Sequence, residues 1–269
     1  MNELKLAVVG KDVSKSVSPQ IHGFIAKEYG IKISYDKVSI SENEFCDRIK
    51  TLLREYDGFN VTIPFKLSVI PYLETLCGDA RTFGAVNTVR TRDLTGYNTD
   101  GAGFALMLKN NGADVKGKNA LVIGAGGAGR SVAKKLADAG AAVSVYDKNL
   151  KNALNVAAEF EHVTALDNLR AEPYYAVINA SGVGMHSTEG VSPADERLLK
   201  LCEVAADLIY VPAKSEFLSI AERCGKKIIN GEAMLFYQAY YADCIYFGLE
   251  PDEERAKALF EKFGEECKK

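Results

Sequence analysis

Short runs of apolar, mostly β-branched residues alternate with longer segments in which apolar residues recur at helical spacing, nearly throughout the chain. Strands are predicted over 4–9, 33–40, 58–63, 85–91, 119–123, 141–146, 176–179, 205–210 and 226–229. Helices are predicted between them over 19–30, 42–55, 66–76, 127–140 and 151–160. Strand, helix, strand at this spacing is typical of parallel α/β units. The end differs, because from Glu232 onward two helices are predicted, separated around Gly248 and Pro251.

The chain shows no fixed-period repeat, low-complexity segment or long linker, so a domain boundary has to be inferred from the motifs. A dinucleotide-binding pattern begins at Lys118, and roughly a hundred residues of α/β pattern precede it. We therefore predict two α/β domains joined near residues 100–115.

Composition narrows the function classes. The chain has 269 residues, 47% of them apolar and 26% charged, with a formal net charge of -3, which is ordinary for a globular protein and argues against a dedicated nucleic-acid binder. No apolar run approaches the roughly 18 residues that span a bilayer, and the opening MNELKLAVVG lacks a secretory signal. We expect a cytoplasmic protein that contacts neither membrane nor nucleic acid.

Cysteine and histidine spacing gives no metal signature. The six cysteines form no CxxC pair, and the three histidines form no HxxxH or HExxH pattern. Scattered thiols in a reducing compartment are the simpler interpretation, and we predict no metal site.

A glycine-rich turn between a predicted strand and a predicted helix is the strongest local motif. Gly124, Gly126 and Gly129 form GxGxxG directly after the strand 119–123. Such a turn lets bare backbone face a pyrophosphate, and the helix N-terminus supplies amide donors. The next strand ends in Asp147, where an acid can bind the hydroxyls of an adenosine ribose.

A second motif, GFNVTIPFK, places Asn60, Thr62 and Lys66 at a strand end and the opening of a predicted helix. In an α/β sheet, polar residues at the carboxyl ends of strands face the ligand crevice. A plain strand-to-helix turn with a solvated lysine would produce the same pattern, so the residues alone leave both interpretations open.

Three further motifs also have structural alternatives. Asp100 in GYNTDGAG precedes a predicted helix and would serve as its N-cap. Ser18 and Pro19 make a good N-cap and first-turn pair, although Ser16 and Ser18 together would also cradle a carboxylate or phosphate. Gln238 lies on a predicted helix, where it would ordinarily be at the surface.

Taken together and in order, these motifs are far more specific than any one of them. From Ser16 to Gln238 the chain resembles the shikimate dehydrogenase family through SVSP, GFNVTIPFK, GAVNT, GYNTDGAG, GAGGAGR, VINASGVGM, DLIYVP and NGEAMLFYQ. The resemblance implies reduction of 3-dehydroshikimate to shikimate by NADPH, on the route to chorismate and the aromatic amino acids. It also implies an N-terminal substrate-binding domain (1–102 with 235–269), a six-stranded Rossmann-like domain (103–234) and a cleft between them.

The same resemblance implies roles for individual residues. Ser16 and Ser18 would bind the substrate carboxylate, and Lys66 paired with Asp100 would perform acid–base catalysis while also gripping the substrate. Asn60 would order its strand end beside the substrate. The other expected substrate contacts are Thr62, Asn87, Tyr210 and Gln238.

The expected cofactor contacts are Gly124, Ala125, Gly126, Gly127, Ala128, Asp147, Lys148, Asn149, Leu208, Gly231 and Met234. Here the chain departs from its family, since Asp147-Lys148-Asn149 replaces the usual Asn-Arg-Thr/Ser that grips the 2′-phosphate of NADP. A carboxylate there favours NAD, whereas Lys148 provides a cation without the guanidinium fork. We expect NADP as the family's cofactor, with NAD also used.

Two alternatives remain. A quinate/shikimate dehydrogenase with NAD preference would differ only in accepting one more hydroxyl on its substrate. A non-catalytic sensor of nucleotide or shikimate would have no physical need for Lys66 and Asp100. The sequence leaves monomer and homodimer open.

Overall fold

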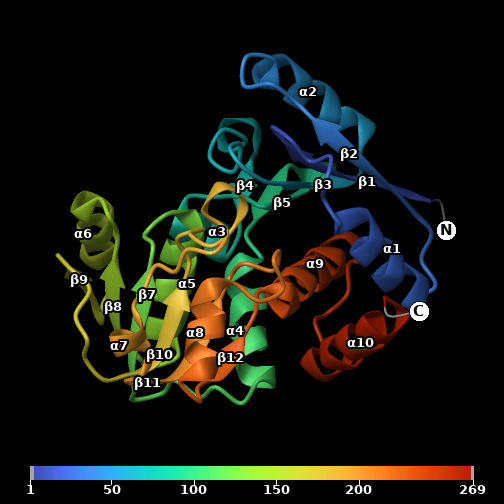
Figure 1. Cartoon of the computed structure of the whole chain (residues 1–269). Coiled ribbons are helices and arrows are strands. Elements are labelled where there is room, and N and C mark those ends of the chain that lie inside the picture. The colour runs from blue at the N-terminus through green and yellow to red at the C-terminus, as the bar shows by residue number, and fades with distance from the viewer. Residues whose placement is uncertain (1–2, 268–269) are drawn as a thin grey trace. The chain divides into compact units, whose positions relative to one another are not determined.

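The computed structural model describes residues 3–267 and divides into two compact units. The first unit extends to Gly103 and resumes at Phe236, and the second covers Phe104–Leu235. Each unit is built on its own six-stranded sheet (Figure 1). The protein is therefore an α/β protein with two sheets, as the alternating pattern predicted.

The sheet of the first unit contains the parallel pairing that the pattern predicted, together with antiparallel pairs. Its strands are β1 (Leu4–Gly10), β2 (Ile33–Ser39), β3 (Gly58–Val61), β4 (Thr75–Leu76), β5 (Thr88–Arg90) and β6 (Thr95–Tyr97), in the order β2-β1-β3-β5-β6-β4. Strand β1 pairs in parallel with β2 and β3, whereas β5 pairs antiparallel with β3 and β6. Only residues 91–94 connect β5 to β6, and a connection this short permits only an antiparallel pair.

Helices cover both faces of this sheet, with α2 on one face and α1, α9 and α10 on the other (Figure 1). Their bounds are α1 (Ser18–Glu28), α2 (Phe45–Glu55), α9 (Glu232–Phe247) and α10 (Glu253–Glu266), with the shorter α3 (Asp79–Phe83) and the 3₁₀ turns Ile70–Tyr72 and Thr91–Asp93. Helix α9 begins in the second unit. The predicted pair of C-terminal helices and the break at Gly248 are confirmed.

The helix predicted over 66–76 is wrong. That segment forms turns, one 3₁₀ turn over Ile70–Tyr72 and the short strand β4. Pro71 lacks the N–H that a longer helix would need at that position. The helical spacing was misleading, since the apolar side chains of Val69 and Ile70 pack into the core as the turns fold over it.

The sheet of the second unit is parallel and doubly wound, as predicted. Its strands are β7 (Asn119–Ile123), β8 (Ala142–Tyr146), β9 (Val163–Leu166), β10 (Tyr174–Asn179), β11 (Cys202–Asp207) and β12 (Lys227–Ile229), in the order β12-β11-β10-β7-β8-β9. The strand order reverses between β7 and β10. The crevice beyond the carboxyl ends of strands at such a reversal is the usual ligand site of this fold.

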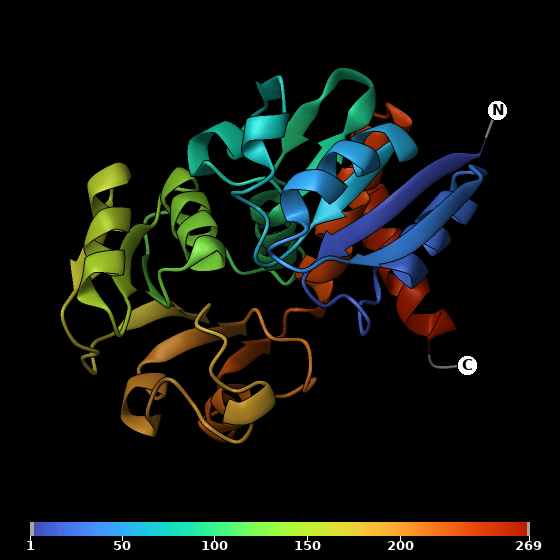
Figure 2. The same cartoon turned by 90° about the horizontal axis from the view of Figure 1, so that it is seen from above.

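Helices α5 and α6 lie on one face of this sheet, and α7 and α8 on the other (Figure 2). Their bounds are α5 (Gly127–Asp138), α6 (Leu150–Glu159), α7 (Glu196–Leu199) and α8 (Glu216–Arg223), with the 3₁₀ turn His186–Thr188. Helix α4 (Asp100–Asn110) begins in the first unit and ends in the second. Strand β9 was not predicted from the sequence, because it is short and Val163 is its only buried residue.

Candidate functional site

Lys66 and Asp100 form the polar centre of the first unit. The Nζ of Lys66 donates to Oδ2 of Asp100 at 2.6 Å, and Nδ2 of Asn87 donates to Oδ1 of the same carboxylate at 2.8 Å. Asn87 Nδ2 also lies 3.4 Å from Oε1 of Gln238, which is half-buried and not at the surface. The Lys66 and Asp100 side chains are 31% and 16% exposed, so a ligand can reach a pair that is partly shielded from water.

The turn after β3 places the side chain of Lys66 at this polar centre. Strand β3 ends at Val61, so Thr62 and Lys66 lie in a turn and not at the opening of a helix as predicted. The backbone N–H of Thr62 donates to Val9, and the ring of Phe65 is buried and stacked on Phe45 at 4.3 Å. Anchoring of Phe65 leaves the next side chain, Lys66, directed out of the core.

Asn60 and Asn87 are buried, and their amide groups are used within the protein. Asn60 Oδ1 accepts from the hydroxyl of Tyr35 at 2.7 Å, while its Nδ2 donates to Asn87 O and Thr88 Oγ1. The Oδ1 of Asn87 accepts from the backbone N–H of Thr99 at 2.9 Å. These bonds fix the orientation of the Asn87 amide that meets Asp100.

The two serines of SVSP lie together at the start of α1. Ser16 Oγ donates to Ser18 Oγ at 3.0 Å, and the Ser18 backbone N–H donates to Ser16 Oγ. Ser18 is the first residue of the helix and not its N-cap as predicted, because Val17 occupies that position and offers no side-chain cap. Two half-buried hydroxyls beside uncapped helical amides suit a carboxylate.

The glycine-rich turn of the second unit is shaped for close backbone approach. Gly124 has φ +105° and a Cβ there would meet the backbone of Ser181, while a Cβ on Gly129 would overlap the carbonyl of Gly124. Gly126 and Gly127 are exposed, and a Cβ on either would meet open space. Helix α5 begins at Gly127, so its free amides face a surface that suits the pyrophosphate of a dinucleotide.

Asp147 closes β8 and is tied to the same turn. Its Oδ2 accepts from the backbone N–H of Ala125 at 2.8 Å, and its Oδ1 accepts from Asn149 N at 2.9 Å and Asn152 Nδ2 at 3.3 Å. The side chain of Asn149 caps α6 by accepting from Lys151 N, while Lys148 is exposed. A carboxylate therefore lies beside the glycine turn, with an exposed lysine next to it in sequence.

The loops after β10 and β11 are joined by a buried carboxylate that the sequence analysis did not single out. Asp207 accepts from Asn179 Nδ2 at 3.1 Å, from Ile209 N at 3.0 Å and from Ser215 Oγ at 2.5 Å. Burial raises the pKa of Asp207, and these hydrogen bonds oppose the rise. One side chain thus holds both ends of the loop that contains Tyr210.

The remaining predicted cofactor residues lie around that loop, together with Tyr210, which is a predicted substrate contact. Leu208 is half-buried and its N–H donates to Asn179, whereas the Tyr210 side chain is 40% exposed. Gly231 donates to Ile209, and a Cβ on it would overlap the carbonyl of Leu208. Met234 is half-buried near the start of α9.

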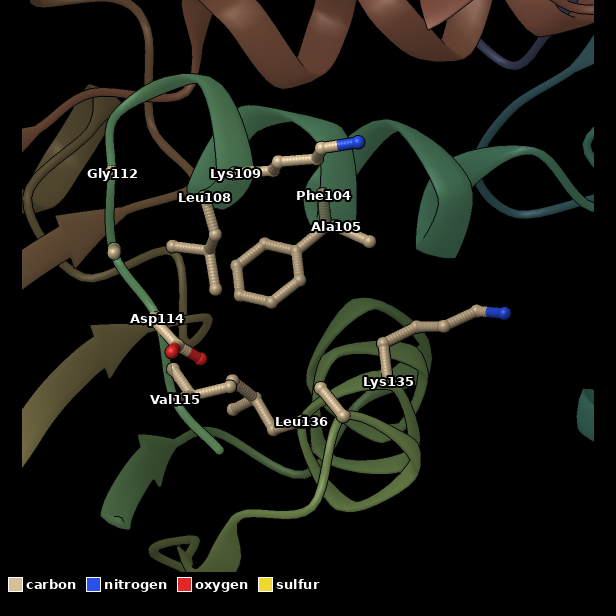
Figure 3. A pocket seen from close by; sticks show the side chains of 11 residues that line it. Phe104, Ala105, Leu108, Lys109, Gly112, Asp114, Val115, Lys135 and Leu136 are labelled. Atoms are coloured by element: carbon tan, nitrogen blue, oxygen red, sulfur yellow. The ribbon is translucent and has the colours of Figure 1, made fainter. Parts of the chain in front are cut away.

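A cavity of about 330 Å³ lies elsewhere in the second unit, and no predicted site residue lines it. Figure 3 shows the apolar side chains of Phe104, Leu108 and Leu136 facing it, with Lys109 and Lys135 extending away. Within residues 3–267, no cluster of His, Cys, Asp and Glu side chains could hold a metal, and no helix is long and apolar enough to cross a membrane.

Two family models match the chain over most of its length. Residues 8–89 match the shikimate dehydrogenase substrate binding domain, and residues 106–194 match shikimate / quinate 5-dehydrogenase. The chain is also 36% identical over 263 residues to shikimate dehydrogenase (NADP(+)) of Carboxydothermus hydrogenoformans, covering 93% of this chain and 94% of that protein. It belongs to the shikimate dehydrogenase family.

Solved shikimate dehydrogenases have the same fold. The Thermus thermophilus enzyme in complex with NADP(H) and shikimate matches with a TM-score of 0.87 and 34% identity, over 97% of this chain and 99% of that one. The Listeria monocytogenes enzyme in complex with shikimate and NAD matches with a TM-score of 0.83 and 27% identity, over 96% of each chain. Membership of this family makes the protein an oxidoreductase acting on a CH–OH group.

Proposed function

We propose that this protein is a shikimate dehydrogenase, which reversibly reduces 3-dehydroshikimate to shikimate with NADPH for the synthesis of chorismate and the aromatic amino acids. The observation that most supports it is the 2.6 Å contact between Lys66 and Asp100 in a member of this family. Residues 1–102 with 235–269 bind the substrate, and residues 103–234 bind the cofactor.

Lys66 moves the proton. Reduction of a ketone leaves an alkoxide that needs a proton as charge develops, and a positioned ammonium can donate it. Asp100 holds Nζ in place by its hydrogen bond and, because it also accepts from Asn87, is itself held in place. In the direction of shikimate oxidation the same pair accepts the proton.

The substrate is held at both ends by residues of the first unit. Ser16 and Ser18 bind its carboxylate. Its ring hydroxyls meet Lys66 and Asp100 together with Thr62, Asn87 and Gln238, while Asn60 keeps Asn87 oriented. Tyr210 of the second unit is the remaining substrate contact.

The nicotinamide cofactor, when bound, supplies or accepts the hydride. The backbone of Gly124–Ala128 at the start of α5 holds its pyrophosphate. Asp147, Lys148 and Asn149 meet the adenosine ribose and its 2′ substituent. Leu208, Gly231 and Met234 contact the nicotinamide half. Asp207 fixes the loop that contains Leu208, and the N–H of Gly231 donates to Ile209 of the same loop.

The test is shikimate-dependent reduction of NADP and of NAD by the purified protein. Turnover of shikimate supports the proposal, and a protein that binds shikimate and nucleotide without turnover would be a sensor. Because one family model is described as shikimate / quinate 5-dehydrogenase, quinate belongs in the same assay. If quinate matches or exceeds shikimate in kcat/KM, the broader quinate/shikimate assignment replaces the narrow one.

We further propose that the enzyme works in the cytoplasm, where its pathway and its reduced cysteines belong, on a small-molecule substrate and without nucleic acid or membrane as partner. Sedimentation of the purified protein distinguishes a monomer from a homodimer.

A further inference from the structure

A buried histidine–aspartate pair outside the acid–base centre joins two helices of the first unit. His22 Nδ1 on α1 lies 2.6 Å from Oδ1 of Asp243 on α9, across 221 positions of sequence, and both side chains are 1% exposed. Among the described residues, four buried side-chain polar atoms have no hydrogen-bond partner, and His22 Nε2, Asp243 Oδ2 and the hydroxyl of the adjacent Tyr246 are three of them.

Such a pair does little for stability. Burying two ionisable groups costs free energy that their mutual contact returns only in part, and well-packed apolar residues of similar volume are often as stabilising or more so. The unpartnered atoms add a further cost. A buried cluster that contributes little to stability is expected to have another role, such as holding neighbouring residues in place.

The His22 ring packs on a tyrosine that leads to the substrate site. Its plane is stacked on that of Tyr35, with ring centroids 4.5 Å apart and an interplanar angle of 16°. The Tyr35 hydroxyl donates to Asn60 Oδ1 at 2.7 Å. Burial raises the pKa of that hydroxyl, and the charge of the nearby Asp243 carboxylate adds to the rise. Tyr35 thus connects the His22 ring with Asn60.

The pair also links two substrate-binding elements through their helices. His22 lies four residues after Ser18 on α1, about one turn along the helix. Asp243 lies five residues after Gln238 on α9. The pair therefore fixes the helix that begins with the serines against the helix that presents Gln238.

We propose that His22 and Asp243 are positioning residues for substrate binding. They act through Tyr35 to hold Asn60, and by joining α1 to α9 they hold Ser18, where the substrate ring and carboxylate meet these residues. This rests on the proposed function. The role is specific to the substrate, because the expected cofactor residues belong to the second unit, and among them only Met234, near the start of α9, shares a helix with Asp243.

The first test removes the Tyr35 hydroxyl and keeps its ring. We expect Tyr35→Phe to raise KM for shikimate about tenfold, with kcat and KM for NADP nearly unchanged. The reason is that the lost contact stabilises the bound substrate equally in the ground state and in the transition state. Tyr29→Phe is the matched control, because its hydroxyl meets Tyr240 on the same helix α9 but leads to no substrate residue. An unchanged KM in Tyr35→Phe would overturn the proposal.

The second test separates positioning from stability. Asp243→Asn is expected to lower Tm and to raise KM for shikimate. The double variant His22→Leu with Asp243→Leu is expected to restore Tm but not KM, because a leucine side chain on α1 packs in the core without stacking on Tyr35. If KM recovers together with Tm, the pair is merely structural. If the double variant does not fold, the coupling between Asp243→Asn and Tyr35→Phe decides: KM effects that fail to add support the proposal, and additive effects overturn it.

A third readout identifies the end of the substrate that is affected. The wild type should have a higher kcat/KM for shikimate than for its uncharged methyl ester, and Asp243→Asn should reduce this ratio, because α1, which begins with Ser18, is then less firmly held against α9. An unchanged ratio in Asp243→Asn would overturn the link through Ser18. Failure of the wild type to turn over shikimate would instead overturn the proposed function, which keeps the two failures distinct.

Discussion

The backbone N–H of Ala125 donates to the carboxylate of Asp147 at 2.8 Å, so the acid that directly follows β8 is held against the glycine turn that follows β7. Asn149 N and Asn152 Nδ2 occupy the other carboxylate oxygen. Three donors orient this side chain where a dinucleotide's ribose would approach the turn. This carboxylate would repel a dianionic 2′-phosphate beside it, whereas two ribose hydroxyls would donate hydrogen bonds to it.

This arrangement predicts dual use of cofactors. We expect kcat/KM with NADP to exceed that with NAD by less than about a hundredfold, because Lys148 offsets the carboxylate only as a point charge. Asp147→Asn should shift the ratio further toward NADP, and Lys148→Ala toward NAD. The measurement is kcat/KM for each cofactor at fixed shikimate. A preference for NADP above about a hundredfold, with no change in Asp147→Asn, would show that the carboxylate does not face the ribose.

Ser16→Ala tests the carboxylate anchor. The Ser16 hydroxyl is one of two that lie 3.0 Å apart at the start of α1, and an anchor acts equally in the ground and transition states. We expect KM for shikimate to rise about tenfold with kcat within about twofold of wild type. Ser14→Ala is the control, since Ser14 is exposed and its hydroxyl bonds Asp12. A fall in kcat at unchanged KM would contradict the anchoring role.

Asp207 gives a prediction on pH and stability. Because burial raises its pKa in the folded state, the folded protein binds the proton more readily than the unfolded chain does. The ordinary carboxyl pKa is about 4. As the pH rises from that value, the free energy of unfolding of the wild type relative to Asp207→Asn should therefore decrease, and it should level off above the raised pKa of folded Asp207. Urea unfolding of both proteins between about pH 4 and pH 7 measures this.

Asp195 provides the opposite case in the same unit. Its carboxylate caps α7 by accepting from Leu198 N, and this bond lowers the pKa of Asp195. The stability that Asp195 contributes should be present above the ordinary carboxyl pKa and lost as the pH falls toward the lowered one. If the stabilities of Asp195→Asn and Asp207→Asn relative to wild type changed with pH in the same direction, one of the two assignments would be wrong, and the sign of the change would show which.

The sequence predicted best what local patterns determine. Strand β7, the glycine turn and α5 follow one another within 20 residues, so spacing alone indicated the dinucleotide site. The resemblance to a family singled out Lys66 and Asp100, and the structure brings them together across 34 positions. The helix over 66–76 was predicted from residue spacing alone. That segment forms turns because Pro71 disfavours a longer helix and because its apolar side chains pack against the core.

The sequence could not indicate contacts that depend on distant segments. Tyr35 looked like an ordinary strand residue, yet its hydroxyl meets Asn60 and its ring meets His22. Asp243 lies in an apolar helix with no motif around it, and its role depends on a histidine 221 positions away. Asp207 belonged to a quoted motif, but only its burial and three donors show that it fixes a loop.

Lys66→Ala, assayed beside the wild type for oxidation of shikimate by NADP, tests both the proposed reaction and the role of its acid–base pair. We expect the wild type to turn over shikimate and Lys66→Ala to lose at least about a hundredfold in kcat, with NADP binding near normal. The reason is that Lys66 takes up the proton of the reacting hydroxyl in this direction and contributes no nucleotide affinity. Lys11→Ala, at an exposed surface ion pair with Glu42, should keep wild-type kcat. A Lys66→Ala enzyme with more than about a tenth of wild-type kcat would show that this lysine is mainly structural.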